Sequence, residues 1–214
     1  MNRLLPIRLG MCFLFLAACK SEKKATLPFY NDPFFTPHWF TQTEEIPKNF
    51  HRISSFSLIN QEGKVICNSD FDNRIYVADF FFTRCPGICP KMTEHMRIIQ
   101  DRFLNDPEVL LISHSVTPEK DAVEILKEYA EHKGVVAGKW HLVTGKRSEI
   151  YSLGRKDYFV EEDLGLTKKE EEFIHTENFV LIDHNRYIRG IYNGLNKSSI
   201  NQLMADIESL KKEK

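Results

Sequence analysis

Two cysteines, Cys85 and Cys89, are separated by three residues in the stretch FFFTRCPGICPKM, and a proline follows each of them. Thiolates are nucleophiles and soft metal ligands, so this pair could form a structural disulfide, act as a redox couple or bind Cu(I) or zinc. A closed zinc site needs further protein ligands, and Cys67 is distant in sequence. We therefore expect disulfide chemistry or copper binding, and the spacing leaves both open.

The elements around the pair place it at a junction. The mostly apolar run RIYVADFFFT predicts a buried central strand before the cysteines. Pro90 suits the first turn of a following helix, whose apolar residues share one face: Met92, Met96, Ile99 and Phe103. Cys89 then stands at a helix N-terminus, where backbone amides favour negative charge. We expect its thiolate to form more easily than that of a free cysteine.

The remaining pattern alternates strands and helices. Residues 53–68 predict a hairpin that turns at Gly63, and 109–116 predict a second buried strand. Thr117 and Pro118 predict the start of a helix that Gly134 ends. Further strands are expected at 140–145, 178–183 and 187–193, and a last helix at 198–212. This order predicts an α/β fold, a thioredoxin-like sandwich with a central mixed β-sheet flanked by helices and an N-terminal hairpin.

The N-terminus has the features of a bacterial lipoprotein signal. Arg3 and Arg8 precede a short apolar run, and Leu16-Ala17-Ala18-Cys19 resembles a lipobox, in which the cysteine is lipidated. We expect residues 1–18 to be removed, which changes the net charge from −1 to −1 − 2 = −3. Residues 19–50 then form a membrane tether and extended aromatic arm, and 51–214 form the domain. The mature protein is expected in the bacterial cell envelope, lipid-anchored outside the cytoplasmic membrane, in an oxidising compartment.

Composition and cysteine count narrow the function further. Hydrophobic residues make up 42% and charged residues 28% of the 214, which fits a globular core, and the charge gives no basic field for nucleic acid. Cys12 leaves with the signal and Cys19 takes the lipid, so Cys67, Cys85 and Cys89 remain. We expect Cys67 to be a small buried hydrophobic residue. Residue chemistry by itself leaves three histidines as candidate partners of the cysteines: His114, His175 and His184.

Several segments together resemble the SCO/SenC family of copper-binding, thioredoxin-like proteins that assist cytochrome c oxidase assembly. These are FFFTRCPGICPKM, SHSVTPEKDAVEILKEYAEHKG, WHLVTG and FIHTENFVLIDHNRYIRGIYNG, in order over about residues 50–210. The resemblance implies that Cys85, Cys89 and His175 bind copper, with His184 ranked second and Asp121 in a supporting role. Two positions depart from the family pattern, because Thr117 and Ile174 stand where the family usually has Asp.

The resemblance implies a membrane-anchored copper chaperone that passes Cu(I), with Cu(II) as the alternative, to the copper-receiving subunit of a cytochrome oxidase. The second hypothesis is a thiol-disulfide oxidoreductase that keeps the client's copper-site cysteines reduced. There Cys85 and Cys89 would be catalytic and form a disulfide when oxidised. The thioredoxin analogy makes Cys85 the attacking thiol, whereas the expected thiolate at Cys89 argues against that order. A peroxidase using Thr83 and Arg84 beside Cys85 finds no support in the resemblance.

Overall fold

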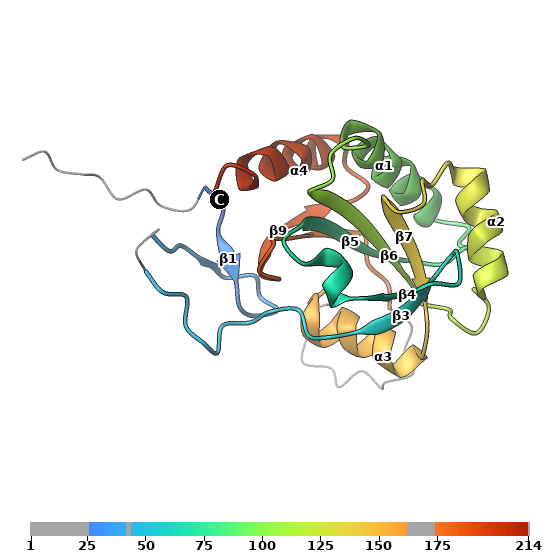
Figure 1. The fold of residues 1–214 in the computed structure, drawn as a ribbon, viewed down its shortest axis with the longest axis horizontal. Helices are drawn as coiled ribbons and strands as arrows, with labels where there is room; N and C mark the ends of the chain where they lie inside the picture. The colour runs from blue at the N-terminus through green and yellow to red at the C-terminus, as the bar shows by residue number, and fades with distance from the viewer. Residues whose placement is uncertain (1–25, 42–43, 162–173, 214) are drawn as a thin grey trace, which may run out of the picture.

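The computed structural model describes residues 26–41, 44–161 and 174–213, and these form a mixed sheet flanked by helices (Figure 1). Its strand order is β2-β1-β9-β8-β5-β6-β7-β3-β4. The predicted thioredoxin-like α/β sandwich is confirmed. The strands are β1 (Phe29–Tyr30), β2 (Pro37–His38), β3 (Ser57–Asn60), β4 (Val65–Cys67), β5 (Ile75–Phe81), β6 (Val109–Ser115), β7 (Trp140–Thr144), β8 (Asn178–Ile182) and β9 (Ile188–Asn193).

The directions of the strands determine which segments of the chain lie beside the cysteine loop. β5, β6 and β7 run parallel, whereas β8 runs antiparallel to β5 and β9 antiparallel to β8. The start of β8 therefore lies beside the carboxyl end of β5, and the turn between β8 and β9 lies beside its amino end. Tyr76 pairs with Ile182 and Ala78 with Val180, which fixes this register.

Helices cover both faces of the sheet. α1 (Cys89–Arg102), α2 (Val123–Lys133) and α4 (Lys197–Leu210) pack on one face, and α1 and α2 are the crossovers that parallel strands require. α3 (Arg147–Ser152) and a π-helical turn (Leu153–Asp157), which the sequence did not predict, cover the other face. Met92, Met96 and Ile99 are fully buried in the first layer, as the helical spacing indicated.

Three local expectations can be compared with the structure. The hairpin turns at Gly63 (φ 73°), and α2 ends at Gly134 (φ 70°), as predicted. The predicted start of α2 at Thr117 is wrong, because the helix begins at Val123. The Thr117 hydroxyl donates to the Asp121 carboxylate (2.9 Å), and the amide of Asp121 donates to the Thr117 carbonyl (2.9 Å), so these residues form a turn instead. Cys67 is half-exposed at the end of β4 and not buried, with its sulfur 3.3 Å from the Ser69 hydroxyl.

The aromatic arm extends the sheet. β1 pairs with β9 through Tyr30 and Ile188, and β2 pairs with β1, so the arm forms one edge. The Phe29 ring packs edge-on against Phe50 and Tyr187. The signal segment 1–18, the expected lipid site Cys19 and the acidic segment 162–173 lie outside the described residues. Within the part of the chain that is described, no helix has the length and apolar character to span a bilayer.

Candidate metal centre

The two cysteines lie where β5 gives way to α1. The Cys85 amide donates to the Phe82 carbonyl (3.3 Å), which turns the chain, and Cys89 is the first residue of α1. Cys89 is buried, with 4% of its surface exposed, and Cys85 is half-buried against the same core layer. Both are free thiols. The pair therefore presents one accessible sulfur and one sulfur behind it.

The acidities of the two thiols are opposite to the prediction. Burial would raise the pKa of Cys85, but hydrogen bonds from the Cys89 thiol and from the amides of Cys89, Gly87 and Ile88 outweigh it and lower that pKa. Burial, followed by the hydrogen bond with Cys85, raises the pKa of Cys89. The expectation of an easily formed Cys89 thiolate is thus wrong. The amides at the helix start point to the Cys85 sulfur, while Cys89 itself is buried.

Asp121 anchors the strand end that leads into the cysteine loop. Its buried carboxylate accepts hydrogen bonds from the hydroxyls of Thr83 (2.6 Å), Ser115 (2.6 Å) and Thr117 (2.9 Å). Thr83 stands two residues before Cys85, and Ser115 ends β6, so the carboxylate ties the two neighbouring strand ends together. The three hydroxyl oxygens and both carboxylate oxygens are satisfied this way. Asp121 is therefore a positioning residue for the loop.

His175 is the histidine that the topology brings to the cysteines. It lies three residues before β8, whose start is beside the carboxyl end of β5. A cavity of about 310 Å³ opens at this point, and its lining includes Cys85, Cys89, Ile174 and His175. The His175 side chain is exposed. Two thiols and an imidazole thus share one hollow.

The other two candidate histidines lie elsewhere. His184 is in the turn between β8 and β9, at the opposite end of β5. His114 is fully buried in the layer under α3, where its ring stacks on Phe80 at 4.7 Å between centroids. Burial lowers the pKa of His114 to about 4. Neither lines the cavity.

The three predicted ligands do not form a closed site in this conformation. Among the described residues, no group of three or more His, Cys, Asp or Glu side chains is arranged to hold a metal ion. A second hollow of about 350 Å³ flanks the cysteines on the other side, lined in part by Tyr129, His132 and Lys133. The pair is therefore accessible from two sides.

Two side chains near the pair were not predicted as part of the site. Asp79, on β5, is buried, and one of its carboxylate oxygens has no hydrogen-bond partner among the described residues. The Tyr129 hydroxyl is 2.8 Å from that of Thr93, which donates to the Cys89 carbonyl (2.9 Å). Burial raises the pKa of Tyr129 to about 12, and the neighbouring Cys89 and Asp79 act in the same direction. An acid inside the apolar run RIYVADFFFT was the sequence signal for Asp79.

The departures from the family pattern have structural counterparts. Ile174 is buried, packs in the core layer under α3 and also lines the cavity beside His175, so this wall is apolar. The Thr117 hydroxyl donates a hydrogen bond to the Asp121 carboxylate. Asp121 is thus the carboxylate that this chain places at the end of β6.

The fold and the site define the class of protein. It is a thioredoxin-like domain with an accessible dithiol at the end of its central strand and a histidine beside that dithiol. A family model described as SCO1/SenC matches residues 44–212, so the chain belongs to the SCO1/SenC family. The SCO1 protein homolog of Bacillus subtilis (strain 168) is 28% identical over 205 residues, covering 94% of this chain and 93% of the relative.

Solved structures agree with this assignment. A SCO1/SenC family lipoprotein from Bacillus anthracis is 28% identical, with a TM-score of 0.66 over 75% of this chain and 95% of that one. BsSco, described as a member of the Sco family of cytochrome c oxidase assembly proteins with a disulfide switch, is also 28% identical, with a TM-score of 0.65 over 81% and 100%. ScoI from Arabidopsis thaliana, solved with copper bound, shares the fold at 23% identity, with a TM-score of 0.57 over 74% and 98%.

Proposed function

We propose that this protein is a copper chaperone that binds Cu(I) through Cys85, Cys89 and His175 and delivers it to the copper-receiving subunit of a cytochrome c oxidase. The observation that carries the proposal is the cavity whose lining includes Cys85, Cys89 and His175. Thiolates select Cu(I), and imidazole suits copper as well. The copper-bound ScoI structure and the assembly role given for BsSco support the metal and the client.

The arrangement suits a metal that must leave again. Cys85, with its lowered pKa, offers the first thiolate, and Cys89 contributes the second after losing its proton to solvent. His175 is exposed, so its side chain can turn toward the two sulfurs without disturbing the core. Few ligands at an open surface allow a client thiolate to replace them one at a time. Asp121 keeps the strand end in place meanwhile.

A second function, thiol-disulfide exchange, is favoured by the contrast between the two cysteines. The Cys85 thiolate would attack a client disulfide, forming a mixed disulfide and releasing one client thiolate. Cys89 would then lose its proton and attack the Cys85 sulfur, releasing the second client thiolate. The client disulfide is reduced, and Cys85 and Cys89 are oxidised to a disulfide. The disulfide switch described for BsSco supports this alternative.

We further propose that the protein is held in the bacterial cell envelope by a lipid on Cys19, after removal of residues 1–18. The lipobox-like order of basic, apolar and small residues supports this, as does the description of the Bacillus anthracis structure as a lipoprotein. Residues 19–50 would serve as tether and arm. Nucleic acid is not an expected partner, given the net charge of −1.

The test is a Cu(I) competition titration of the reduced protein lacking residues 1–19, compared with the variants His175→Ala and His184→Ala. One tight equivalent is expected, weakened by His175→Ala and unchanged by His184→Ala, whose side chain lies at the other end of β5. Absence of competitive binding would remove the copper proposal and leave thiol exchange. Equal affinity in all three proteins would keep copper but exclude His175 as a ligand.

A further inference from the structure

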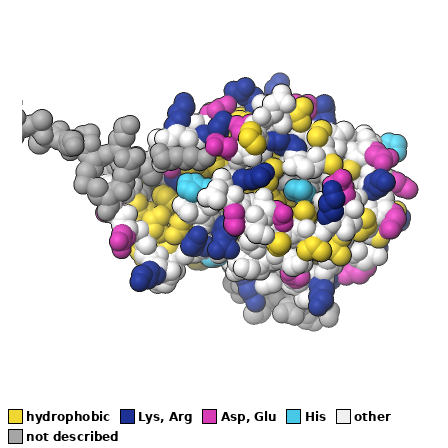
Figure 2. Space-filling view, viewed as in Figure 1, with side chains coloured by type: hydrophobic (Ala, Val, Ile, Leu, Met, Phe, Trp, Pro, Cys, Tyr) yellow, Lys and Arg dark blue, Asp and Glu magenta, His cyan; other side chains and the backbone are white. Residues whose placement is uncertain are grey.

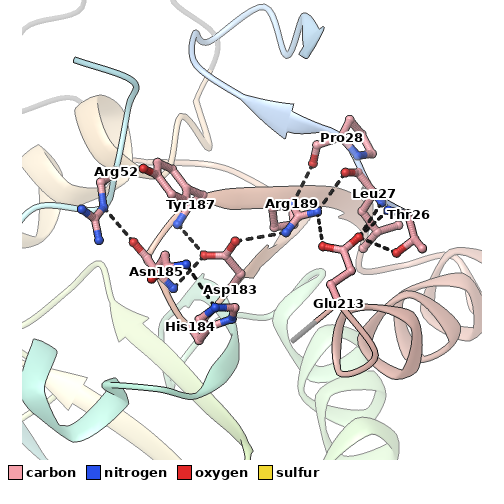
Figure 3. Close-up of polar contacts among 10 residues, drawn as sticks. All are labelled: Thr26, Leu27, Pro28, Arg52, Asp183, His184, Asn185, Tyr187, Arg189 and Glu213. Atoms are coloured by element: carbon pink, nitrogen blue, oxygen red, sulfur yellow. Dashed lines mark hydrogen bonds and ion pairs between the residues drawn. The ribbon is translucent and has the colours of Figure 1, made fainter. Parts of the chain in front are cut away.

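A buried arginine joins the N-terminal arm to the C-terminus of the chain (Figure 3). The Arg189 guanidinium donates to the carbonyls of Leu27 (2.9 Å) and Pro28 (3.1 Å) and forms ion pairs with Asp183 (3.1 Å) and Glu213 (2.6 Å). The Glu213 carboxylate also accepts the Leu27 amide (3.1 Å). Only 2% of the Arg189 side chain is exposed. The first described residues of the arm are therefore held in a defined place.

That place is the end of the sheet remote from the cysteines. α4 runs back from the end of β9, and Figure 1 shows the C-terminus beside the start of β1. Lys211, just after α4, is ion-paired with Asp106 (2.5 Å), which lies three residues before β6. We call the contacts of Arg189 with Leu27, Pro28, Asp183 and Glu213 the clasp. The clasp thus lies at the amino ends of the parallel strands, and the cysteine loop lies at their carboxyl ends. The seven residues of β5 separate the two by about 20 Å.

Exposed apolar side chains gather at the clasp end. Phe34 is 86% exposed in the loop between β1 and β2, which projects past the Tyr30–Ile188 pair, and Trp39 (51%) follows β2. Leu104 and Val136, each 42% exposed, precede β6 and β7 and line a separate depression, away from β1. Figure 2 shows hydrophobic side chains gathered at the end where β1 lies.

We propose that this end, which we call the base, rests on the lipid bilayer, with Phe34 and Trp39 in the interface, and that the cysteine loop consequently faces away from the membrane. The proposal rests on the membrane anchorage proposed above. Six residues lie between Cys19 and Thr26, and the seven steps from one to the other reach at most about 25 Å. The clasp holds the arm at the base, and the lipid on Cys19 is at most this far away. The base, and not the cysteine loop, is therefore brought to the membrane surface.

Apolar contact carries the docking. Aromatic side chains favour the interfacial region of a bilayer, where the ring meets both apolar and polar surroundings. The clasp contains charges of both signs, because Arg189 is ion-paired with Asp183 and Glu213, so no anionic lipid is required. The client's copper site must then lie off the membrane surface, at the height of a loop carried about 20 Å beyond the base.

The chain has two tryptophans, which makes the test direct. Trp140 is buried (1% exposed) and Trp39 is not. The protein that begins with lipidated Cys19 is reconstituted in phosphatidylcholine vesicles, and tryptophan emission is compared with and without brominated phosphatidylcholine, which quenches by contact. In the wild type, the brominated lipid should quench most of the emission that comes from Trp39. In Trp39→Phe, the remaining emission comes from Trp140 and should be the same in both kinds of vesicle. Phe34→Ser should reduce the quenching of Trp39.

Orientation is tested by two matched variants made in the Trp39→Phe background. Phe34→Trp, at the base, should be quenched, and Ile88→Trp, in the cysteine loop, should not; the native side chains are 86% and 38% exposed. Quenching of Ile88→Trp, an unquenched Trp39, or failure of the lipidated protein to float with the vesicles would each overturn the proposal. Copper affinity plays no part in these readouts, so they are independent of the copper titration.

Discussion

Asp79 offers a quantitative test of the energetics beneath the cysteine pair. It lies in the middle of β5, 2% exposed, and one carboxylate oxygen has no hydrogen-bond partner among the described residues. Burial raises its pKa from 3.8 to about 7, although a hydrogen bond from Ser113 lowers it in part. Asp79→Asn keeps the shape and an oxygen for Ser113 while removing the ionisable group. We expect this variant to be more stable than the wild type at neutral pH.

The magnitude follows from proton linkage. Because the pKa is higher in the folded state, the unfolded chain ionises first, and stability is lost as pH rises from about 4 to about 7. At about 1.4 kcal/mol per pKa unit, the loss is about 2 kcal/mol at pH 5 and about 4 kcal/mol at pH 8. The larger figure is an upper bound, since a folded chain can admit water to an ionised carboxylate.

The assay is urea denaturation of reduced, copper-free wild type and Asp79→Asn at four pH values between 5 and 8. The difference in unfolding free energy should grow with pH and level off above pH 7. Asp101→Asn is a matched control, because Asp101 is an exposed acid on α1, and its difference from wild type should not follow this curve. A pH-independent difference for Asp79→Asn would refute the reasoning.

Three further predictions follow from the same contacts. Iodoacetamide at pH 7 should alkylate Cys85 well before Cys89, as mass spectrometry would show, because hydrogen bonds lower the pKa of Cys85 while burial raises that of Cys89; preferential labelling of Cys89 would contradict this. The pKa of His114 is lowered by burial to about 4, so stability is lost as pH falls from about 6.5 to about 4; denaturation of His114→Phe should lack this loss, worth up to about 3 kcal/mol. Arg189→Met leaves Glu213 without its buried partner and should cost about 3–5 kcal/mol in denaturation, with faster proteolysis of the arm; an unchanged midpoint would exclude the clasp.

The sequence determined most of the fold, because the elements around the site have strong local patterns. The apolar run of β5, the spacing of Met92, Met96 and Ile99 on α1, and the alternation of strands and helices predict the sandwich without tertiary information. The start of α2 was predicted wrongly, because a hydroxyl that suits an N-cap was used instead by Asp121, a partner that only the folded turn provides. The short α3 and its π-helical continuation have too weak a periodicity to be predicted.

The sequence also indicated Cys85 and Cys89 as a candidate pair, since three intervening residues allow the sulfurs to come near each other. Which histidine lies near them was decided by the tertiary structure: antiparallel pairing of β8 with β5 places His175 beside the cysteine loop and His184 at the far end. Which thiol ionises first was decided there too, because acidity depends on burial and on where amides point, and neither is set by spacing. Local patterns fix the elements and the chemistry they carry, while strand direction and burial decide which groups meet and in which protonation state.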